Sequence, residues 1–315
     1  MSLNNQTTAS TPSGAGGLQY VMNGLMSRYR ERVPDVLKIA NAMVEQGIIN
    51  NIADIENDHV AFRTMGVPQL GIQSFEKIFS HFGYQKREYF YFEGKKLNAY
   101  WYAPPSPEFP RIFVSELRVW DLPQHIQDII TSYTDEVKTD PVDALDLNDA
   151  AAVDAFLHTP LWRTPSWEDY ETLQQASEYA AWVIYNRYYL NHYTISVHNL
   201  PSGYGDIHKF NEFLKSIGVK LNDSGGKIKI SPDGGLLQSS TVAEMIDAEF
   251  ADGSVHRISG SYVEFAERKV LPQFADLPVD KIGREHRREG FETGNADKIF
   301  ESTFSSQTQK VEMEM

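Results

Sequence analysis

The segment Asp-His-Val-Ala-Phe at residues 58–62 is echoed later in the chain by Asn-His-Tyr-Thr-Ile at residues 191–195. Both segments place a histidine at the head of a short β-prone run, directly after an acid or its amide. Both are followed by a glycine-containing turn and an amphipathic helix, predicted over residues 71–84 and 206–216. Because chance rarely repeats the same parts in the same order, the sequence predicts two duplicated modules.

Each predicted module ends in a strand that carries one glutamate, Glu116 in the first and Glu264 in the second. If the modules pair about a pseudo-twofold axis, His59, His192 and Glu264 converge on one point. Two neutral imidazoles and a carboxylate that leave open positions are typical of non-haem Fe(II) oxygenases, although the same set binds Zn²⁺ or Mn²⁺. We expect Glu116, at the matching place in the first module, to support the ligands or form an ion pair rather than bind the metal.

The alternation of side chains along a strand adds two further candidates to this site. Residues two apart share a face, so His59 and Arg63 point the same way. Arg63 then reaches a carboxylate that is chelated beside His59, and a structural salt bridge is the equal alternative. The same alternation places His198 on the face of His192, where we interpret it as an ordinary strand residue, with support of the metal ligands as the alternative.

The composition is that of an acidic globular protein without cysteine. The chain has 315 residues, of which 41% are hydrophobic, and its formal net charge is −14. This charge opposes contact with nucleic acid phosphates or anionic lipid, so neither is an expected partner. The mean hydropathy of −0.41 and the lack of a long apolar run argue against a membrane span. No apolar leader follows Met1, so we expect a cytoplasmic location.

The predicted fold is α+β, with two paired βαβββ-type modules that form a curved mixed sheet around the metal site and added helices around them. The predicted divisions are a disordered tail (1–16), N-terminal helices (17–56), a first module (57–120), a helical insertion (121–190), a second module (191–270) and a C-terminal segment that closes the pocket (271–315). Residues 17–305 are expected to form one catalytic domain. The basic run at 284–288 is expected on a solvated helix face, and residues 307–315 are expected to fray.

Five segments of the chain resemble the family catalogued as DUF1338, whose characterised members are 2-oxoadipate dioxygenase/decarboxylases. They cover residues 58–64, 191–195, 235–241, 262–268 and 294–303. The resemblance extends from about residue 18 to residue 303. It implies an enlarged relative of the vicinal-oxygen-chelate fold, which agrees with the duplicated modules.

The resemblance also implies a reaction and a set of site residues. His59, His192 and Glu264 are expected to bind Fe(II), with Zn, Mn or Ni as metals that can replace it. The residues expected to bind substrate are Arg63, Gln238 and Ser302. The expected partners are a 2-oxo acid and O₂, and the expected reaction converts 2-oxoadipate to 2-hydroxyglutarate and CO₂ in lysine breakdown.

Two other functions remain open at the level of sequence. The first is a glyoxalase-like isomerase or lyase, in which Zn²⁺ or Ni²⁺ acts as a Lewis acid and Glu116 completes four ligands. The second is a small-molecule binding protein that keeps the paired modules but catalyses nothing. Oxygen consumption separates the dioxygenase from the isomerase or lyase, and loss of a tightly bound metal without loss of ligand affinity would favour the binding protein.

Overall fold

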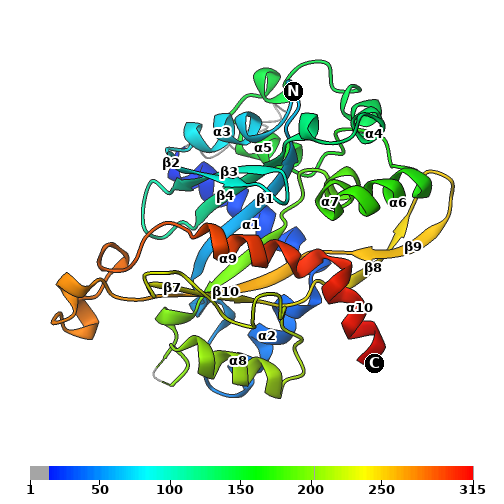
Figure 1. Cartoon of the computed structure of the whole chain (residues 1–315). Helices are drawn as coiled ribbons and strands as arrows, with labels where there is room; N and C mark the ends of the chain where they lie inside the picture. Colours follow the sequence, from blue (N-terminus) through cyan, green and yellow to red (C-terminus); the bar gives the residue numbers. More distant parts are fainter. Residues whose placement is uncertain (1–13, 202, 315) are drawn as a thin grey trace, which may run out of the picture.

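The computed structural model describes residues 14–201 and 203–314 (Figure 1). Within them, one mixed sheet of eight strands runs in the order β2–β3–β4–β1–β5–β10–β7–β6. Its strands are β1 Asn57–Met65, β2 Gln85–Phe92, β3 Leu97–Ala103, β4 Arg111–Leu117, β5 His192–Ser196, β6 Lys229–Ile230, β7 Leu236–Ser240 and β10 Tyr262–Arg268. Two further strands, β8 Met245–Glu249 and β9 Val255–Ser259, form a separate hairpin that projects from the body of the molecule.

The helices surround this sheet. They are α1 Ala15–Arg32, α2 Pro34–Glu45, α3 Ile72–His81, α4 Gln124–Thr134, α5 Ala150–Phe156, α6 Trp167–Ala176, α7 Glu178–Asn186, α8 Ile207–Ser216, α9 Thr293–Phe300 and α10 Ser305–Glu314. Pro34 begins α2 because a proline fits the first turn of a helix but not its interior. The predicted disordered tail ends earlier than expected, since Ala15 and Gly16 already lie in α1, and residues 1–13 lie outside the described residues.

The sheet consists of two modules with the same strand order from centre to edge. The first is β1–β4–β3–β2 and the second is β5–β10–β7–β6. β1 and β5 meet antiparallel at the centre, with His59 opposite Thr194 and Ala61 opposite His192. In each module the next strand outward, β4 or β10, runs parallel to the central one. This arrangement confirms the predicted α+β fold of two paired modules in one mixed sheet.

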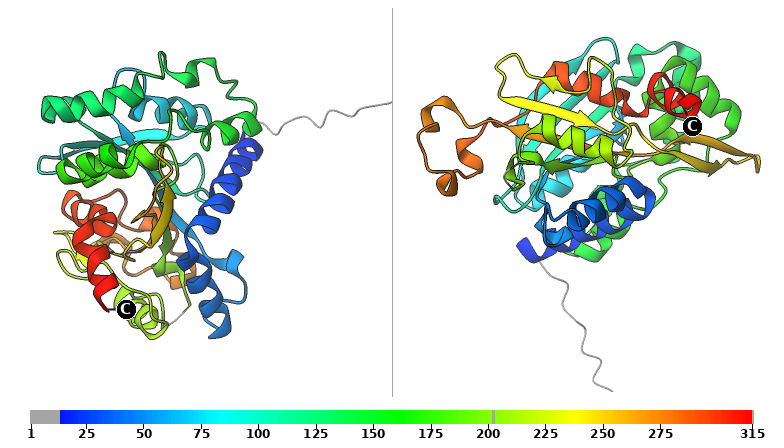
Figure 2. Two further views of the ribbon diagram at one scale, coloured as in Figure 1. Left: turned by 90° about the vertical axis from the view of Figure 1, so that its right-hand side faces the viewer. Right: turned by 90° about the horizontal axis from the view of Figure 1, so that it is seen from below.

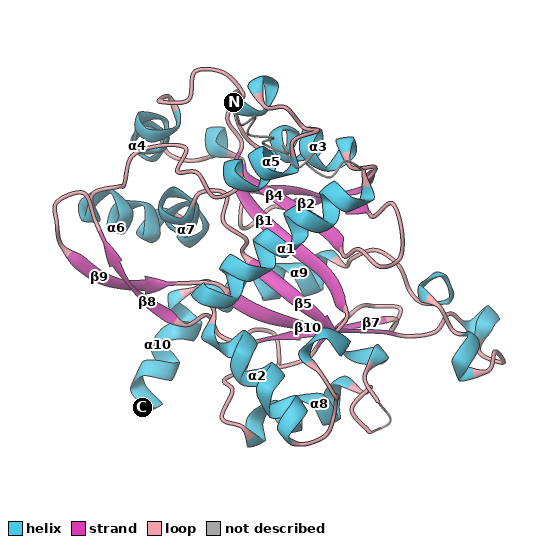
Figure 3. Ribbon diagram, turned by 180° about the vertical axis from the view of Figure 1, so that it is seen from behind, coloured by secondary structure: helices cyan, strands magenta, loops and turns pink. Residues whose placement is uncertain are grey.

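The two faces of the sheet have different coverings. On one face, Phe62 of β1 packs on Phe75 and Phe79 of α3, and Phe265 of β10 packs on Phe210 of α8. α1 and α2 lie on this side as well, and α1 crosses the centre of the sheet (Figure 3). α9 and α10 lie on the other side (Figure 2). The central strands are therefore covered on both faces, and nearly all of their residues are buried.

Three local predictions need correction or detail. Within the helical insertion predicted over residues 121–190, α6 and α7 are separate helices, because Ser177 caps α7 by accepting from the N–H of Ala180. The basic run at 284–288 forms a short 3₁₀ turn, Arg284–His286, rather than the face of an α-helix. Of the segment predicted to fray, residues 307–314 belong to α10, whose N-terminus is held by the Glu178 carboxylate through the N–H of Ser305, and residue 315 lies outside the described residues.

None of the described helices combines the length and the apolar character that crossing a lipid bilayer requires.

Candidate metal centre

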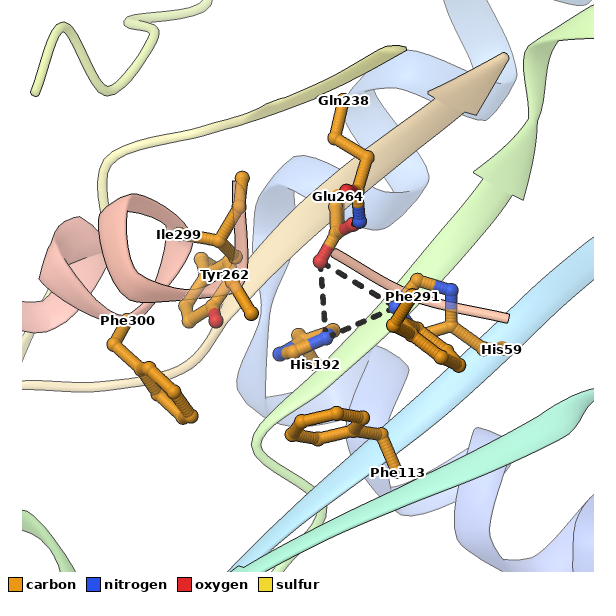
Figure 4. Close-up of a pocket in the computed structure, with 10 residues that line it drawn as sticks. His59, Phe113, His192, Gln238, Tyr262, Glu264, Phe291, Ile299 and Phe300 are labelled. Carbon is orange, nitrogen blue, oxygen red and sulfur yellow. Dashed lines mark hydrogen bonds and ion pairs between the residues drawn. The ribbon is translucent and has the colours of Figure 1, made fainter. Parts of the chain in front are cut away.

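His59, His192 and Glu264 come together at the centre of the sheet, from β1, β5 and β10 (Figure 4). The Nε2 atoms of the two histidines are 3.4 Å apart. Glu264 Oε2 lies 3.1 Å from Nε2 of His192 and 3.5 Å from Nε2 of His59. Their exposed fractions are 1%, 6% and 1%. The two histidines are 133 residues apart in the sequence, and Glu264 follows on a later strand, yet their donor atoms meet in one buried cluster.

The hydrogen bonds of the two histidines leave the correct ring nitrogens for a metal ion. Nδ1 of His59 lies 2.8 Å from Oδ1 of Asp58, and Nδ1 of His192 lies 3.0 Å from Oδ1 of Asn191. Both oxygens accept, so each Nδ1 carries the proton and each Nε2 presents a lone pair to the centre. This outer hydrogen bond is the usual way in which a protein orients a metal-binding histidine.

The electrostatics of the cluster also fit a cation. Burial lowers the pKa of His192 to about 4, so this imidazole is neutral near pH 7. Burial opposes ionisation of Glu264, but the two imidazoles hold the pKa of its carboxyl well below the ordinary value. Among residues 14–201 and 203–314, no lysine or arginine forms an ion pair with Glu264. A buried carboxylate without such a partner is costly, and a divalent cation would compensate its charge.

Asp58 is itself held by two arginines. Arg268 binds it through two hydrogen bonds, Nε to Oδ2 at 2.7 Å and Nη2 to Oδ1 at 2.9 Å. Nη1 of Arg111 donates to Oδ2 at 3.2 Å. Burial opposes ionisation of Asp58, but Arg268 and Arg111 keep its pKa well below the usual range. Sequence reasoning noticed the acid before His59 but gave it no role, because its arginine partners are distant in the chain.

A narrow cavity adjoins the cluster on the side of α9. Its lining residues are His59, Phe113, His192, Gln238, Tyr262, Glu264, Phe291, Ala296, Ile299 and Phe300. Its volume is about 20 Å³, which is room for one or two water-sized atoms. Residues of α9 line it on one side. The aromatic rings make the rest of the wall apolar.

Gln238 was expected to bind substrate, and the structure places it in the cavity wall. Its Nε2 donates to Oε1 of Glu264 at 2.6 Å, and its Oε1 accepts from Nδ2 of Asn295 at 3.0 Å. Asn295 therefore fixes which end of the Gln238 amide faces Glu264. In this structure Gln238 orients the carboxylate, and Asn295, which sequence reasoning missed, orients Gln238.

Arg63 lies behind the cavity wall and is 1% exposed. Its Nη1 donates to Oγ1 of Thr303 at 2.9 Å, and its Nη2 donates to the carbonyl of Phe300 at 3.0 Å. Its Nε has no hydrogen-bond partner. Within the described part of the chain, no carboxylate lies at ion-pair distance from Arg63. The structural salt bridge that was the alternative for this residue is therefore absent among those residues.

Ser302 is fully buried but does not line the cavity. Its hydroxyl lies 2.8 Å from that of Ser240 and accepts from Nδ2 of Asn222 at 3.0 Å. These bonds tie the end of α9 to the edge of the second module. The expected contact of Ser302 with substrate has no counterpart in this geometry and remains a prediction.

Glu116 does not support the metal ligands, and its assignment as the counterpart of Glu264 was wrong. Glu116 lies on the face of β4 that points away from His59. There its Oε2 accepts from the N–H of Ile72, the first residue of α3, at 3.0 Å. The true counterpart is Glu267, which accepts from the N–H of Ile207, the first residue of α8, at 2.9 Å. Both glutamates place a negative charge at a helix N-terminus, which favours it.

His198 was interpreted as an ordinary strand residue, but it lies outside the strand. β5 ends at Ser196, and His198 lies in the 3₁₀ turn Val197–Asn199. Its Nδ1 accepts from the N–H of Arg268 at 3.2 Å, and burial lowers its pKa to about 4. Its bond to the backbone of β10 supports the chain beside the site, and it forms no bond to the three candidate ligands.

The curved sheet of two βαβββ modules, with a buried His–His–Glu cluster at its centre that could hold a metal ion, has a vicinal-oxygen-chelate-like fold. The model of the family described as 2-oxoadipate dioxygenase/decarboxylase matches residues 21–277. The chain belongs to this enzyme family.

Named relatives agree with this assignment. The chain is 46% identical over 261 residues to the chloroplastic 2-oxoadipate dioxygenase/decarboxylase of Arabidopsis thaliana, covering 79% of this chain and 68% of that one. The chloroplastic/amyloplastic enzyme of Oryza sativa subsp. japonica is 48% identical over 260 residues, with 79% and 70% covered. The crystal structure of hydroxyglutarate synthase in complex with 2-oxoadipate from Oryza sativa has a TM-score of 0.84 and 41% identity, covering 98% of this chain and 99% of that one.

Proposed function

We propose that this chain is an Fe(II)-dependent dioxygenase/decarboxylase that converts 2-oxoadipate and O₂ to 2-hydroxyglutarate and CO₂. The observation that carries the proposal is the buried cluster of His59, His192 and Glu264, whose donor atoms all lie within 4.8 Å of one another in the wall of an apolar cavity. This donor set with open positions is typical of non-haem iron oxygenases. The relative of known structure from Oryza sativa, which binds 2-oxoadipate, supports the substrate.

The proposed reaction balances without a further reductant. The bond between C1 and C2 of 2-oxoadipate breaks, and C1 leaves as CO₂. C2 gains one oxygen atom of O₂ and becomes the new carboxylate, while C3 gains the other and becomes the carbon that bears the hydroxyl group. The substrate therefore supplies all the electrons that reduce O₂.

His59, His192 and Glu264 would hold the metal through two Nε2 atoms and a carboxylate oxygen. Divalent iron there would supply the one-electron chemistry that lets a closed-shell 2-oxo acid react with O₂, and open positions for both. Gln238 would keep the Glu264 carboxylate in place through its hydrogen bond of 2.6 Å. The apolar rings of the cavity wall would exclude water from the reacting acid.

Arg63 would bind a carboxylate of the substrate. Its guanidinium is buried, it has no ion-pair partner among the described residues, and its Nε is unsatisfied. A buried arginine in this state is costly unless an anion reaches it. Tyr262 and Phe300 line the cavity and separate Arg63 from the cluster. Both residues also lie close to the guanidinium of Arg63. A movement of α9, which carries Phe300, would join the cavity to Arg63 and make room for a six-carbon acid.

The alternative of a glyoxalase-like enzyme used Glu116 as a fourth ligand. Glu116 lies on the other face of the sheet, bound to the first turn of α3, so it does not fill this role. We also propose a role in lysine breakdown, which the family resemblance implies, and a cytoplasmic location; the names of the plant relatives give a chloroplastic location for those proteins.

An oxygen electrode tests the proposal. Protein reconstituted anaerobically with Fe(II) is mixed with O₂ and 2-oxo acids of five to seven carbons, and CO₂ and 2-hydroxyglutarate are quantified. We expect equal amounts of O₂ consumed, CO₂ released and 2-hydroxyglutarate formed, with 2-oxoadipate the best substrate. A flat trace for every acid, from protein that metal analysis shows to contain iron, would overturn it.

A further inference from the structure

Strand pairing establishes which residues of the two modules are equivalent. In the antiparallel β1–β5 pairing, His59 lies opposite Thr194 and His192 lies opposite Ala61. A twofold rotation that exchanges the two strands therefore places His59 on His192. On the next strand outward, Arg111 of β4 lies opposite His59, and Tyr262 of β10 lies opposite His192. Arg111 and Tyr262 therefore occupy equivalent places.

Counting two residues further along each strand reaches the metal site. On β10 this residue is Glu264, and on β4 it is Phe113. The equivalence has an independent check three residues later, where Glu116 and Glu267 correspond. Both accept a hydrogen bond from the first residue of the helix in their own module, at 3.0 and 2.9 Å. Phe113 is thus the residue of the first module that occupies the place of the carboxylate ligand in the second.

The side chain of Phe113 lies beside the cluster. It is buried and lines the same cavity as the three candidate ligands. Its ring centroid is 5.0 Å from that of Phe291, so it belongs to an aromatic wall. Figure 4 shows Phe113 and Glu264 on opposite sides of the two imidazoles. A phenyl ring offers no lone pair to a cation, so the fourth position of the duplicated frame provides no protein ligand.

We propose that Phe113 keeps this fourth position open for the substrate. A glutamate at both equivalent places would give a site with four protein ligands, as closed structural sites have, whereas catalytic sites keep a position open. At this position the two modules have equivalent backbones but different side chains, a phenyl ring in the first and a carboxylate in the second. Phe113 is therefore a positioning residue for the proposed reaction, and this inference rests on the proposed function. It assigns the open side of the metal to the first module.

The test adds the missing ligand. Phe113→Glu is compared with wild type and with Phe113→Leu, which keeps an apolar side chain, by titration of apoprotein with Zn²⁺ against a competing chelating dye. We expect Phe113→Glu to bind Zn²⁺ at least about tenfold more tightly than wild type. It should also lose turnover of 2-oxoadipate after Fe(II) reconstitution. Phe113→Leu should match the wild-type Zn²⁺ affinity.

A second pair of variants keeps the test decisive. Glu264→Ala should lose Zn²⁺ affinity, and the double variant Glu264→Ala with Phe113→Glu should recover at least about tenfold of it. If Phe113→Glu does not yield folded protein, Phe113→His brings a neutral ligand to the same place and carries the same expectation. Zn²⁺ affinity no tighter than wild type in the folded variant, together with no recovery in the double variant, would overturn the inference. The Zn²⁺ titrations use no 2-oxo acid, so their outcome is independent of whether the proposed reaction is correct.

Discussion

The two modules share one backbone plan but build opposite walls around the centre of the sheet. In the second module, Glu264 faces the centre and Gln238 on the neighbouring strand holds it by a hydrogen bond. At the equivalent places of the first module stand Phe113 on β4 and Ala99 on β3, which pairs with Ser115 as Gln238 pairs with Ala266. The wall of the second module is therefore polar and ligating, and that of the first is apolar.

In a third pair of equivalent residues, the charged side chain belongs to the first module instead of the second. Arg63 of β1 corresponds to Ser196 of β5, so the first module alone contributes a guanidinium. The comparison teaches that duplication supplies the geometry, by bringing two histidines face to face, while the differences between the copies supply the chemistry. In the proposed enzyme the second module holds the charge of the metal and the first accommodates the acid.

The largest expected effect comes from removing one of the two equivalent histidines. His192→Ala deletes one of the three donors, and we expect metal affinity to fall by more than about 100-fold, since loss of an outer hydrogen bond alone costs about 10–100-fold. Oxygen uptake with 2-oxoadipate should be abolished. Zn²⁺ titration and an oxygen electrode measure both. His198→Gln, a change of a buried histidine outside the cluster, is the control and should bind metal normally.

The next effect contrasts Asp58 with its counterpart Asn191. Asp58→Asn leaves Arg268 buried without its anion and leaves Arg111 with Glu289 as its one remaining carboxylate partner, which we expect to cost about 3–5 kcal/mol of unfolding free energy. Asn191→Ala removes a neutral partner and should cost about 1 kcal/mol. Urea unfolding of the metal-free proteins measures both. Equal losses would show that the charge of Asp58 has no special role.

Asp58, unlike the neutral Asn191, makes the stability of the protein depend on pH. The folded pKa of Asp58 lies below its unfolded value of about 4, so its contribution to stability is present above that pH and is lost as pH falls through the folded value. Wild type should therefore lose more stability than Asp58→Asn on acidification below about pH 4.

A smaller effect concerns Arg63 and Ser196. Arg63→Gln removes the proposed anchor of a substrate carboxylate, and we expect KM for 2-oxoadipate to rise about 30-fold or more, equivalent to about 2 kcal/mol. Zn²⁺ affinity should stay near the wild-type value, because Arg63 makes no hydrogen bond to the three donors. Ser196→Ala, the equivalent change in the second module, should leave KM unchanged. An unchanged KM in Arg63→Gln would contradict the anchor.

The smallest expected effect tests where the modules are alike. Glu116→Gln and Glu267→Gln each weaken the interaction of a carboxylate with a helix N-terminus, and each should cost about 1 kcal/mol of stability. Thermal unfolding of the two variants should give similar shifts, with metal affinity unaffected in both. A loss of metal affinity in Glu116→Gln alone would restore its predicted role beside the ligands.

The sequence was sufficient for the features that repeat locally. The echo around His59 and His192 predicted the duplicated modules, and the alternation along a strand placed Arg63 on the face of His59. The counterpart of Glu264 was misassigned because one glutamate per strand was counted without knowledge of strand register, a property of long-range pairing. Phe113 escaped notice since an apolar residue in a strand has no sequence signal of function. The partners of Asp58 were also missed, because Arg268 lies 210 residues away.

The central claim is that one metal ion binds to His59, His192 and Glu264 and keeps its open side toward Phe113. The most direct measurement is anomalous diffraction from anaerobic crystals that contain Fe(II) and 2-oxoadipate. The account predicts one iron peak bonded to these three side chains, with oxygen atoms of the acid as its ligands on the side of the first module. Iron at another place, or a fourth protein ligand where the acid should bind, would contradict it.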